Sequence, residues 1–415
     1  MGRPIGIDLF AGAGGLSLGF EQAGFKIAAA VDIDPIHCAA HEYNFPNCKT
    51  ICKDVAELTG EEIRKISGVK EKKIDVVFGG APCQGFSLIG KRALNDPRNR
   101  LVNHFVRLVL ELAPSYFLFE NVKGLTIGKH RQFLEEIIST FEKNGYSVEG
   151  NYRVLNASNY GVPQKRERLF LFGCRKNLKI PIYPKKLSEI SISDALADLP
   201  EVEKFTELLD RDWVETILGS PSKYAEKLRE AEFASCNYGY SRKYNPNLLT
   251  SSARTTHTPL SRKRFAETPH GKTEPVSRFF KLDPQGVCNT LRAGTASDRG
   301  AFTSPRPIHP FTPRCITVRE AARIHSYPDW FRFHVTKWHG FRQIGNSVPP
   351  LLAQAVAMEI LRALEKKPSK PKKILRLGDS LLLNLSMSQA AYYYGVSPNV
   401  IPKRTRSARP KVICA

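Results

Sequence analysis

One cysteine, Cys83, stands in a context that suits chemistry. It lies in Gly80-Ala-Pro-Cys-Gln-Gly-Phe-Ser87, directly after an apolar run, Ile74 to Phe78, that has the character of a buried strand. The flanking Pro82 and Gly85 favour an irregular, exposed loop over a helix. Open α/β sheets build their sites at the carboxyl ends of strands. We therefore expect Cys83 to be a reactive thiol, although an isolated cysteine is more often a small buried hydrophobe.

A carboxylate occupies a similar position after the next apolar run. The run Tyr116-Phe-Leu-Phe119 ends on Glu120-Asn121-Val122. If the two runs are neighbouring strands, their carboxyl ends bring the thiol and the Glu120 side chain to one edge of the sheet. A cysteine nucleophile beside a proton donor is the arrangement of covalent catalysis with general-acid assistance.

A glycine-rich turn follows the first predicted strand and indicates a nucleotide site. Ile7–Phe10 runs into Ala11-Gly-Ala-Gly-Gly-Leu16, and carboxylates follow at Asp32 and Asp54. A dinucleotide fingerprint would need glycine where Ser17 stands, which disfavours a nucleotide-dependent oxidoreductase. A ligand without a pyrophosphate suits this turn better, and two carboxylates around it point to adenosine. Each aspartate has the alternative role of a surface charge or a helix cap.

The elements that position these residues follow from hydrophobic periodicity. Apolar runs that alternate with helical patterns predict an α/β fold with a doubly wound, mostly parallel sheet. The predicted strands are Pro4–Phe10, Ile27–Asp32, Ile74–Gly79, Ser115–Glu120 and Leu169–Cys174. The predicted helices are Asn103–Ala113, Arg131–Lys143, Thr317–His325, with Thr317 and Glu320 as a capping pair, and Leu351–Glu365.

The pattern divides the chain into four parts. Residues 1–178 form a catalytic and cofactor-binding domain, 179–312 a smaller loop-rich domain, 313–366 a return segment that completes the first, and 367–415 a basic tail. The tail opens with the linker-like Lys366-Lys-Pro-Ser-Lys-Pro-Lys-Lys373. Within it, Ser388–Tyr394 weakly resembles half of a helix-turn-helix.

The net charge of +22 is concentrated in two segments. Residues 242–306 carry 12 Lys/Arg against 4 Asp/Glu, and residues 362–415 carry 12 against 2. Basic segments on a near-neutral body predict a polyanion-binding surface, with nucleic acid as the partner. The nine scattered cysteines predict reduced thiols and no zinc site. Without a long apolar run or a signal peptide, we expect a cytoplasmic protein with no membrane association.

With these residues in place, the chain resembles the bacterial DNA (cytosine-5)-methyltransferases, which use S-adenosylmethionine. The likeness covers roughly residues 4–175 and 310–365. Six motifs occur in the order typical of that family: Asp8-Leu-Phe-Ala-Gly-Ala-Gly-Gly15, Pro82-Cys83-Gln84, Glu120-Asn121-Val122, Gln164-Lys-Arg-Glu-Arg168, Arg319-Glu-Ala-Ala-Arg323 and Gly345-Asn-Ser-Val348.

The resemblance implies catalytic roles for four residues. Cys83 would add to C6 of cytosine and Glu120 would stabilise charge at N3. Arg166 and Arg168, two apart in an extended segment, would share a face near the flipped base, with Arg168 on the base itself. Solvated or phosphate-binding arginines are the alternative. No metal is implied.

The resemblance also implies a pocket for S-adenosylmethionine, released as S-adenosylhomocysteine. Phe10 would stack on the adenine, and Asp32 and Asp54 would hold the ribose and the base. The family most often has Glu where Asp32 stands, so the ribose contact has Asp34 as its alternative. The other implied cofactor residues are Ala11, Gly12, Gly14, Gly15, Leu16, Ile33, Val55, Pro82, Leu101, Asn346, Ser347 and Val348.

Double-stranded DNA is the implied partner, with 179–312 as the target-recognition domain. The resemblance implies that the loop Leu88–Arg100 closes over the DNA. The implied DNA contacts are Gln84 and Ser87 before that loop, Lys91, Arg92 and Arg98 on it, and Thr290, Arg292, Arg262, Arg264 and Arg299 in the recognition domain. Phosphate contact alone is the alternative for each of these arginines.

The resemblance further implies a monomer in the bacterial nucleoid that protects host DNA beside a restriction endonuclease. Two other functions remain open, a tRNA cytosine-5 methyltransferase and an inactive DNA-binding protein on the same scaffold. Relatives that act on tRNA usually carry Cys-Phe-Thr near the glutamate motif, where this chain has Val122-Lys-Gly-Leu125.

Overall fold

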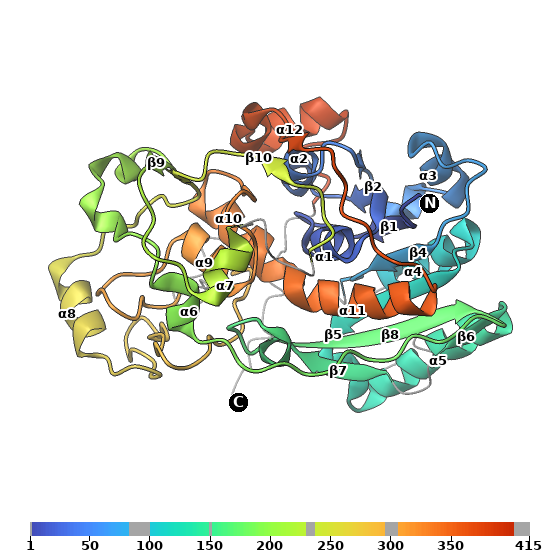
Figure 1. Ribbon diagram of the computed structural model, residues 1–415, viewed down its shortest axis with the longest axis horizontal. Coiled ribbons are helices and arrows are strands. Elements are labelled where there is room, and N and C mark those ends of the chain that lie inside the picture. Colours follow the sequence, from blue (N-terminus) through green and yellow to red (C-terminus); the bar gives the residue numbers. More distant parts are fainter. Residues whose placement is uncertain (1, 83–99, 149–151, 230–236, 295–305, 402–415) are drawn as a thin grey trace, which may run out of the picture.

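A central twisted sheet forms the middle of the fold, and helices flank this sheet on both faces (Figure 1). The computed structural model describes residues 2–82, 100–148, 152–229, 237–294 and 306–401. The strands of the main sheet are β1 (Ile5–Leu9), β2 (Lys26–Asp32), β3 (Lys49–Cys52), β4 (Val76–Gly79), β5 (Tyr116–Val122), β6 (Tyr146–Val148), β7 (Arg153–Asn156) and β8 (Glu167–Arg175). The predicted mostly parallel α/β fold is confirmed, and all five predicted strands belong to this one sheet.

The strand order places the candidate residues at one edge. The sheet runs β3-β2-β1-β4-β5-β8-β6, and β7 also pairs with β8. The first five strands are parallel, and the chain order reverses between β1 and β4, which is where α/β sheets leave a crevice for ligands. Strand β8 is antiparallel to β5, so its first residues lie beside the last residues of β5.

Helices cover both faces of the sheet. They are α1 (Gly15–Ala23), α2 (Pro35–Asn44), α3 (Gly60–Ile66), α4 (Arg100–Leu112), α5 (Lys129–Lys143) and α11 (Pro350–Ala363). Helices α9 (Val318–Ile324) and α10 (Lys337–Asn346) pack on each other beside the loop-rich region (Figure 1). The four predicted helices correspond to α4, α5, α9 and α11, and the Thr317–Glu320 capping box is present. On the α1 side, Gly19 lets α11 approach closely, because a Cβ there would lie 2.3 Å from the Ala353 side chain.

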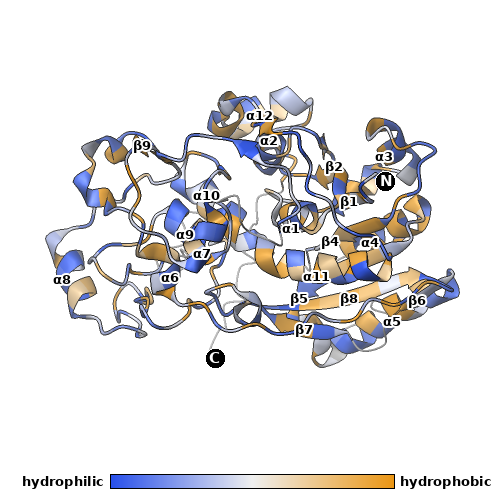
Figure 2. Cartoon of the chain, in the orientation of Figure 1, coloured by the Kyte–Doolittle hydropathy of each residue, from blue (hydrophilic) through white to orange (hydrophobic). Residues whose placement is uncertain are grey.

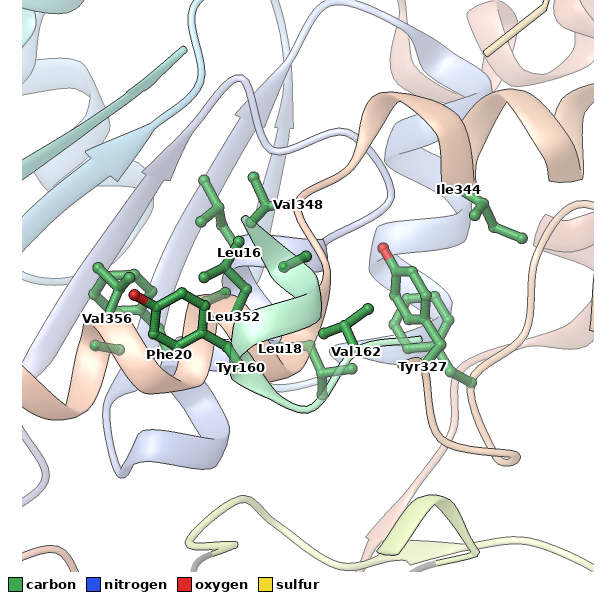
Figure 3. Packing of buried hydrophobic residues seen from close by; sticks show 14 of the residues in the cluster. Leu16, Leu18, Phe20, Tyr160, Val162, Tyr327, Ile344, Val348, Leu352 and Val356 are labelled. Carbon is green, nitrogen blue, oxygen red and sulfur yellow. The ribbon is translucent and has the colours of Figure 1, made fainter. Parts of the chain in front are cut away.

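The largest apolar cluster joins segments that are far apart in the sequence. Leu16, Leu18 and Phe20 of α1 pack with Leu352 and Val356 of α11, and Tyr160, Val162, Tyr327, Ile344 and Val348 belong to the same cluster (Figure 3). Hydropathy follows this arrangement, since α11, β5 and β8 are largely apolar and the outer helix α8 is mostly polar (Figure 2). The C-terminal part of the chain therefore completes the core around the glycine-rich turn.

The region between the two halves of the core has little regular structure. It contains α6 (Ile192–Leu196), α7 (Lys223–Leu228), α8 (Pro259–Glu267) and the short strands β9 (Val214–Glu215), β10 (Arg242–Lys243) and β11 (Leu248–Leu249). Buried ion pairs fasten it to α9: Arg323 contacts Asp198 at 3.1 Å, and Arg314 contacts Glu201 at 2.8 Å and Glu320 at 2.7 Å.

Part of the basic C-terminal segment folds against α2. Strand β12 (Leu375–Arg376) pairs with β10, and helix α12 (Met387–Tyr394) lies where the sequence only weakly resembles half of a helix-turn-helix. The hydroxyls of Tyr393 and Tyr394 each donate to the Glu42 carboxylate at 2.8 Å. Leu382 and Leu383 are buried against Ala39, Ala40 and Tyr43 of α2. Within the described part of the chain, no helix is long and apolar enough to cross a membrane.

Candidate active site and nucleic-acid cleft

Glu120 and Arg168 form an ion pair at the edge where β5 and β8 meet. The antiparallel register places Glu120 opposite Phe170 and Val122 opposite Arg168, so Glu120 and Arg168 are diagonal neighbours on one face. The Arg168 Nε lies 3.2 Å from the Glu120 Oε1. Both side chains are largely buried, which strengthens their attraction relative to a surface pair.

The chain leading to Cys83 passes directly over this pair. A Cβ on Gly80 would lie 2.3 Å from the Glu120 Oε2, so only glycine lets the carboxylate approach the end of β4. The Asn121 side-chain amide donates to the Ala81 carbonyl at 3.0 Å and holds the segment just before Pro82. Glu120 therefore lies beside the segment that leads to the thiol, while Cys83 itself falls outside the described residues.

Burial and nearby charge act in opposite directions on the Glu120 carboxyl. Burial raises its pKa above the usual range of a glutamate, and the guanidinium groups of Arg168 and Arg166 offset part of that rise. A carboxyl with a raised pKa retains its proton to higher pH and can donate that proton inside the site.

Arg166 has a different environment from Arg168. It is fully buried, and its two Nη atoms donate to the Leu291 carbonyl at 2.9 Å and the Gly345 carbonyl at 2.8 Å. The two predicted catalytic arginines therefore have different contacts. Arg168 contacts Glu120, whereas Arg166, just before β8, binds Leu291 and Gly345 at the end of α10. The predicted shared face does not account for this, because β8 begins only at Glu167.

Gln164 and His325 extend this buried network. The Gln164 Oε1 accepts from the Leu291 amide at 3.0 Å, and its Nε2 contacts the His325 Nδ1 at 2.9 Å. The opposite ring nitrogen of His325 donates to the Ser347 carbonyl at 3.1 Å. Burial lowers the pKa of His325 well below its usual value, so the ring is neutral and can accept at one nitrogen while it donates at the other.

The glycine-rich turn is tied to the end of β2. The Gly12 amide donates to the Asp32 Oδ2 at 2.8 Å, and the Asp34 amide donates to the Oδ1 at 2.8 Å. Phe10 has a φ of 63°, a conformation unusual for a side chain of this size, and it lies partly exposed at the carboxyl end of β1. The Asp32 carboxylate thus fixes the turn and remains partly accessible.

Asp34 and Asp54 have capping roles, as the sequence left open. Asp34 is buried, caps α2 through the Ile36 amide and accepts from Arg342 at 2.8 Å. Asp54 accepts from the Ala56 amide at 2.9 Å and remains partly exposed. Since Asp34 is buried and Asp32 is partly exposed, Asp32 has the more accessible carboxylate of the two.

The segment 345–348, in which Gly345 and Asn346 end α10 and Ser347 and Val348 follow it, reaches the glycine-rich turn from the far end of the chain. A Cβ on Gly15 would lie 2.4 Å from the Val348 carbonyl oxygen, so the two segments are in direct contact. Among the predicted cofactor residues, Pro82 and Asn346 are exposed, and Ile33, Leu101 and Ser347 are partly exposed. Gly12 is also partly exposed, and the buried members are Ala11, Gly14, Gly15, Leu16, Val55 and Val348.

A basic pocket of about 1230 Å³ lies between the β5–β8 edge and the loop-rich region. Of the predicted DNA contacts, Thr290 and Arg292 line it. Arg262 and Arg264 do not: on α8, Arg262 pairs with Glu203, and Arg264 pairs with Glu274 at 3.4 Å. Arg168 also lines the pocket, together with four basic residues that were not predicted as DNA contacts: Lys123, Lys165, Arg278 and Arg306.

These missed residues carried little sequence signal. Lys123 directly follows the Glu120 motif and Lys165 lies within the Gln164–Arg168 motif, so neither stands out before these motifs are recognised. Arg278 and Arg306 lie in a segment without periodicity. Six predicted DNA contacts fall outside the described residues: Gln84, Ser87, Lys91, Arg92, Arg98 and Arg299. No cluster of three or more metal-binding side chains occurs among the residues that the structure describes.

Comparison with known proteins bears on this geometry. The family model for C-5 cytosine-specific DNA methylase matches residues 6–362. The chain is 64% identical over 406 residues to the Type II methyltransferase M.XorII of Xanthomonas oryzae pv. oryzae, covering 98% of this chain and 96% of that protein. It is 34% identical to the Type II methyltransferase M.DdeI of Desulfomicrobium norvegicum, covering 85% of this chain and 88% of that protein.

A solved structure agrees in fold and sequence. A DNA modification methyltransferase encoded within an E. coli prophage superposes with a TM-score of 0.73 at 35% identity, covering 88% of this chain and all of that one. The motif order, the Glu120–Arg168 pair and the match over 6–362 point the same way. This chain belongs to the C-5 cytosine-specific DNA methylases, is a DNA cytosine-5-methyltransferase of the Type II kind, and shares the family's use of S-adenosylmethionine.

Proposed function

We propose that this protein methylates C5 of one cytosine within a specific duplex sequence, through a covalent bond between Cys83 and C6 of a flipped-out base. The observation that carries the proposal is the Glu120–Arg168 pair, held 3.2 Å apart beside the segment that leads to Cys83. Cytosine C5 is a weak nucleophile, so the ring needs activation from both a thiolate and an acid. Because the base is buried in a duplex, it must leave the stack to reach them.

The bond changes balance as follows. The Cys83 thiolate adds its electron pair to C6, and N3 takes up charge that a proton or hydrogen bond from Glu120 neutralises. C5, now enamine-like, takes the methyl group from the sulfonium of S-adenosylmethionine. The electrons of the broken S–CH3 bond remain on that sulfur, and the product S-adenosylhomocysteine leaves as a thioether. A base then removes the C5 proton, and the electrons of that C–H bond re-form the C5–C6 double bond as the thiolate leaves. Cysteine suits both ends of this sequence, as a strong nucleophile and an adequate leaving group.

The two arginines have separate roles in this scheme. Arg168, paired with Glu120 and lining the basic pocket, orients the carboxyl and contacts the base. Arg166 acts as a positioning residue, because its two Nη atoms already donate to the Leu291 and Gly345 carbonyls. It therefore holds Leu291 and the C-terminal end of α10 against the edge where β5 and β8 meet.

The glycine-rich turn at 11–16 and the segment 345–348 fit an adenosine ligand. The partly exposed Asp32 carboxylate can accept from ribose hydroxyls, Phe10 offers a ring face, and Asp54 lies at the next strand end. S-adenosylmethionine supplies an electrophilic methyl group on a sulfonium. The close approach of Gly15 to Val348 holds the two sides of this pocket together.

Duplex DNA is proposed to lie over the basic pocket, with residues 179–312 as the recognition domain. Lys123, Lys165 and Arg306 line that pocket and suit phosphate contact. The loop Leu88–Arg100 is proposed to close over the DNA. The protein is further proposed to act as a monomer and to protect host DNA from a cognate endonuclease.

The test is transfer of labelled methyl from S-adenosylmethionine to duplex DNA and to tRNA, followed by bisulfite sequencing of the DNA. We expect label in DNA as 5-methylcytosine at one repeated site, and none with Cys83→Ser. Label in tRNA but not in DNA would favour the tRNA enzyme, and label in neither would favour an inactive DNA-binding protein.

A further inference from the structure

A short, closed loop in the loop-rich region projects Arg278 into the basic pocket. The backbone closes the loop at its base: the Glu274 amide donates to the Phe279 carbonyl at 2.8 Å, and the Lys281 amide donates to the Lys272 carbonyl at 2.8 Å. Inside it, the Arg278 amide donates to the Glu274 carbonyl at 2.8 Å. The segment Glu274-Pro-Val-Ser-Arg-Phe279 is thus a tight hairpin turn with a defined shape.

A buried carboxylate braces this turn. Glu274 is only 1% exposed, and its side chain accepts from the Val276 amide at 3.1 Å and the Ser277 amide at 2.5 Å. Arg264 of α8 lies 3.4 Å away and neutralises it. Arg264 is a predicted DNA contact, but this pairing makes it a support for the loop.

The loop is also anchored below its tip. Phe279 packs against a cluster of Phe265, Ile308 and Cys315, and its ring centroid lies 6.2 Å from that of Phe265. Phe280 packs against the main core. An anchored and braced turn keeps its tip in one place before any ligand binds, which lowers the entropic cost of binding.

Arg278 is the basic residue at that tip, and its backbone is held in a strained form. Its φ is 59°, a left-handed conformation that most side chains avoid. Its side chain is exposed and lines the pocket together with Arg168 and Arg292. Strain of this kind persists where the surrounding structure fixes a residue for a purpose.

We propose that Arg278 determines sequence specificity by contacting the edge of a guanine in the major groove, and that Glu274 is its positioning residue. This inference rests on the proposed DNA methylation at the same site. A guanidinium matches the two acceptors of guanine with two parallel donors, which no other base offers in that groove. A phosphate contact would need only charge, so a braced and strained tip would bring it no benefit.

The experiment measures site preference rather than overall rate. Duplexes randomised around the target cytosine are methylated and scored by bisulfite sequencing for wild type, Arg278→Gly, Glu274→Ala and two controls. Glycine suits a φ of 59°, so Arg278→Gly removes the side chain without adding backbone strain. The controls are Arg262→Ala, which alters a basic residue outside the pocket lining, and Lys123→Ala, which alters a proposed phosphate contact.

We expect Arg278→Gly to lose preference for guanine at one position by about 10- to 100-fold, the usual worth of such a contact. Glu274→Ala should relax the same position to a smaller extent, although Arg278 is still present. Arg262→Ala should leave the preference intact, and Lys123→Ala should slow all sequences alike. A uniform loss with an unchanged preference for Arg278→Gly would overturn the inference. Absence of DNA methylation by the wild type would instead refute the activity on which it rests.

Discussion

At the scale of single residues, the site depends on a diagonal pair across two antiparallel strands. Because β8 runs against β5, Arg168 at the start of one strand meets Glu120 near the end of the other. Gly80 makes room for the carboxylate, and Asn121 holds the Ala81 carbonyl beside it. The acid is therefore oriented by its neighbours before a base arrives.

Replacement of this acid should remove catalysis and its pH dependence together. Burial raises the pKa of Glu120, so the wild-type rate should fall as the pH rises through that value and the proton is lost. We expect Glu120→Gln to lower kcat by about 10²- to 10⁴-fold, the range for general acids. The remaining rate should lack that pH dependence.

The matched control for this prediction is Glu135→Gln, an exposed carboxylate on α5 that pairs with Arg131 and lies outside the lining of the basic pocket. It should keep the wild-type rate and pH profile. Equal losses in the two variants, measured by single-turnover methyl transfer, would assign the effect to general charge rather than to the acid.

A second buried carboxyl, Asp8, lies beneath the glycine-rich turn. Ser17 donates to its Oδ2 at 2.7 Å, and His41 lies 3.1 Å from the Ser17 hydroxyl. Burial raises the pKa of Asp8 to about 8, and burial lowers the pKa of His41 to about 3, so the ring is neutral. The folded protein therefore holds a proton on Asp8 that the unfolded chain releases at a much lower pH.

This linkage predicts a loss of stability with rising pH. Because the folded pKa is raised, the contribution of Asp8 is fully present below its unfolded value of 3.8 and is lost as the pH rises through about 8. Asp8→Asn should reduce that slope by up to about 1.4 kcal/mol per pH unit. Urea unfolding at several pH values between the unfolded and the folded pKa measures it, and parallel slopes in both proteins would contradict the assignment.

At the scale of elements, periodicity located most of the sheet but not its whole topology. The strands that became β1, β2, β4, β5 and β8 and four helices were predicted because each has a clear apolar run or face. β3, β6 and β7 are three or four residues long and, unlike the equally short β4, each mixes polar with apolar residues, so none has a continuous apolar run. Strand direction also has no local signature, so the antiparallel β8 emerged only from pairing.

The site was predictable where chemistry is carried by motifs, and less so where it depends on packing. Glu120 and Arg168 were each singled out by their motifs, but their ion pair was not predicted, and the buried role of Arg166 depends on contacts with distant parts of the chain. Arg262 and Arg264 looked like DNA contacts because charge alone was visible. Their acidic partners, Glu203 and Glu274, are apparent only in three dimensions.

Helix α10 contacts the segment that contains Arg292 and Ala293, and this contact gives a prediction at the scale of elements. A Cβ on Gly345 would lie 2.3 Å from the Ala293 nitrogen and from the Arg292 carbonyl carbon. Gly345→Ala should displace that segment, cost about 1–3 kcal/mol of stability and weaken DNA binding. Gly124→Ala is the control, since a Cβ there meets nothing within 4 Å. Equal DNA affinity in Gly345→Ala and wild type, by fluorescence anisotropy, would contradict this coupling.

At the scale of the whole molecule, the C-terminal basic segment combines two kinds of sequence. Residues 375–394 pack on α2 and are held by the tyrosine contacts to Glu42. Residues 402–415 carry 5 Lys/Arg and no Asp or Glu. A cut after residue 401 therefore removes the charge of residues 402–415 and keeps the contacts of residues 375–394 with α2.

Two truncations test this division. Removal of 402–415, which keeps the packed residues 375–394, should flatten the salt dependence of DNA binding by about 0.9 in slope for each phosphate that the shortened chain no longer neutralises. Removal of 367–415 should flatten it as well and also destabilise the protein, because the apolar face of α2 is uncovered. An unchanged salt slope in both truncated proteins would mean that the segment does not touch DNA.

The central claim is the covalent bond between Cys83 and the target base. The most direct measurement uses a duplex with 5-fluorocytosine at the methylated position, because fluorine cannot leave C5 as a proton does and the adduct cannot break down. With S-adenosylmethionine present, we predict a denaturant-stable protein–DNA species whose cross-linked peptide contains Cys83, and none with Cys83→Ser. No such species, or a cross-link through any other residue, would contradict the account.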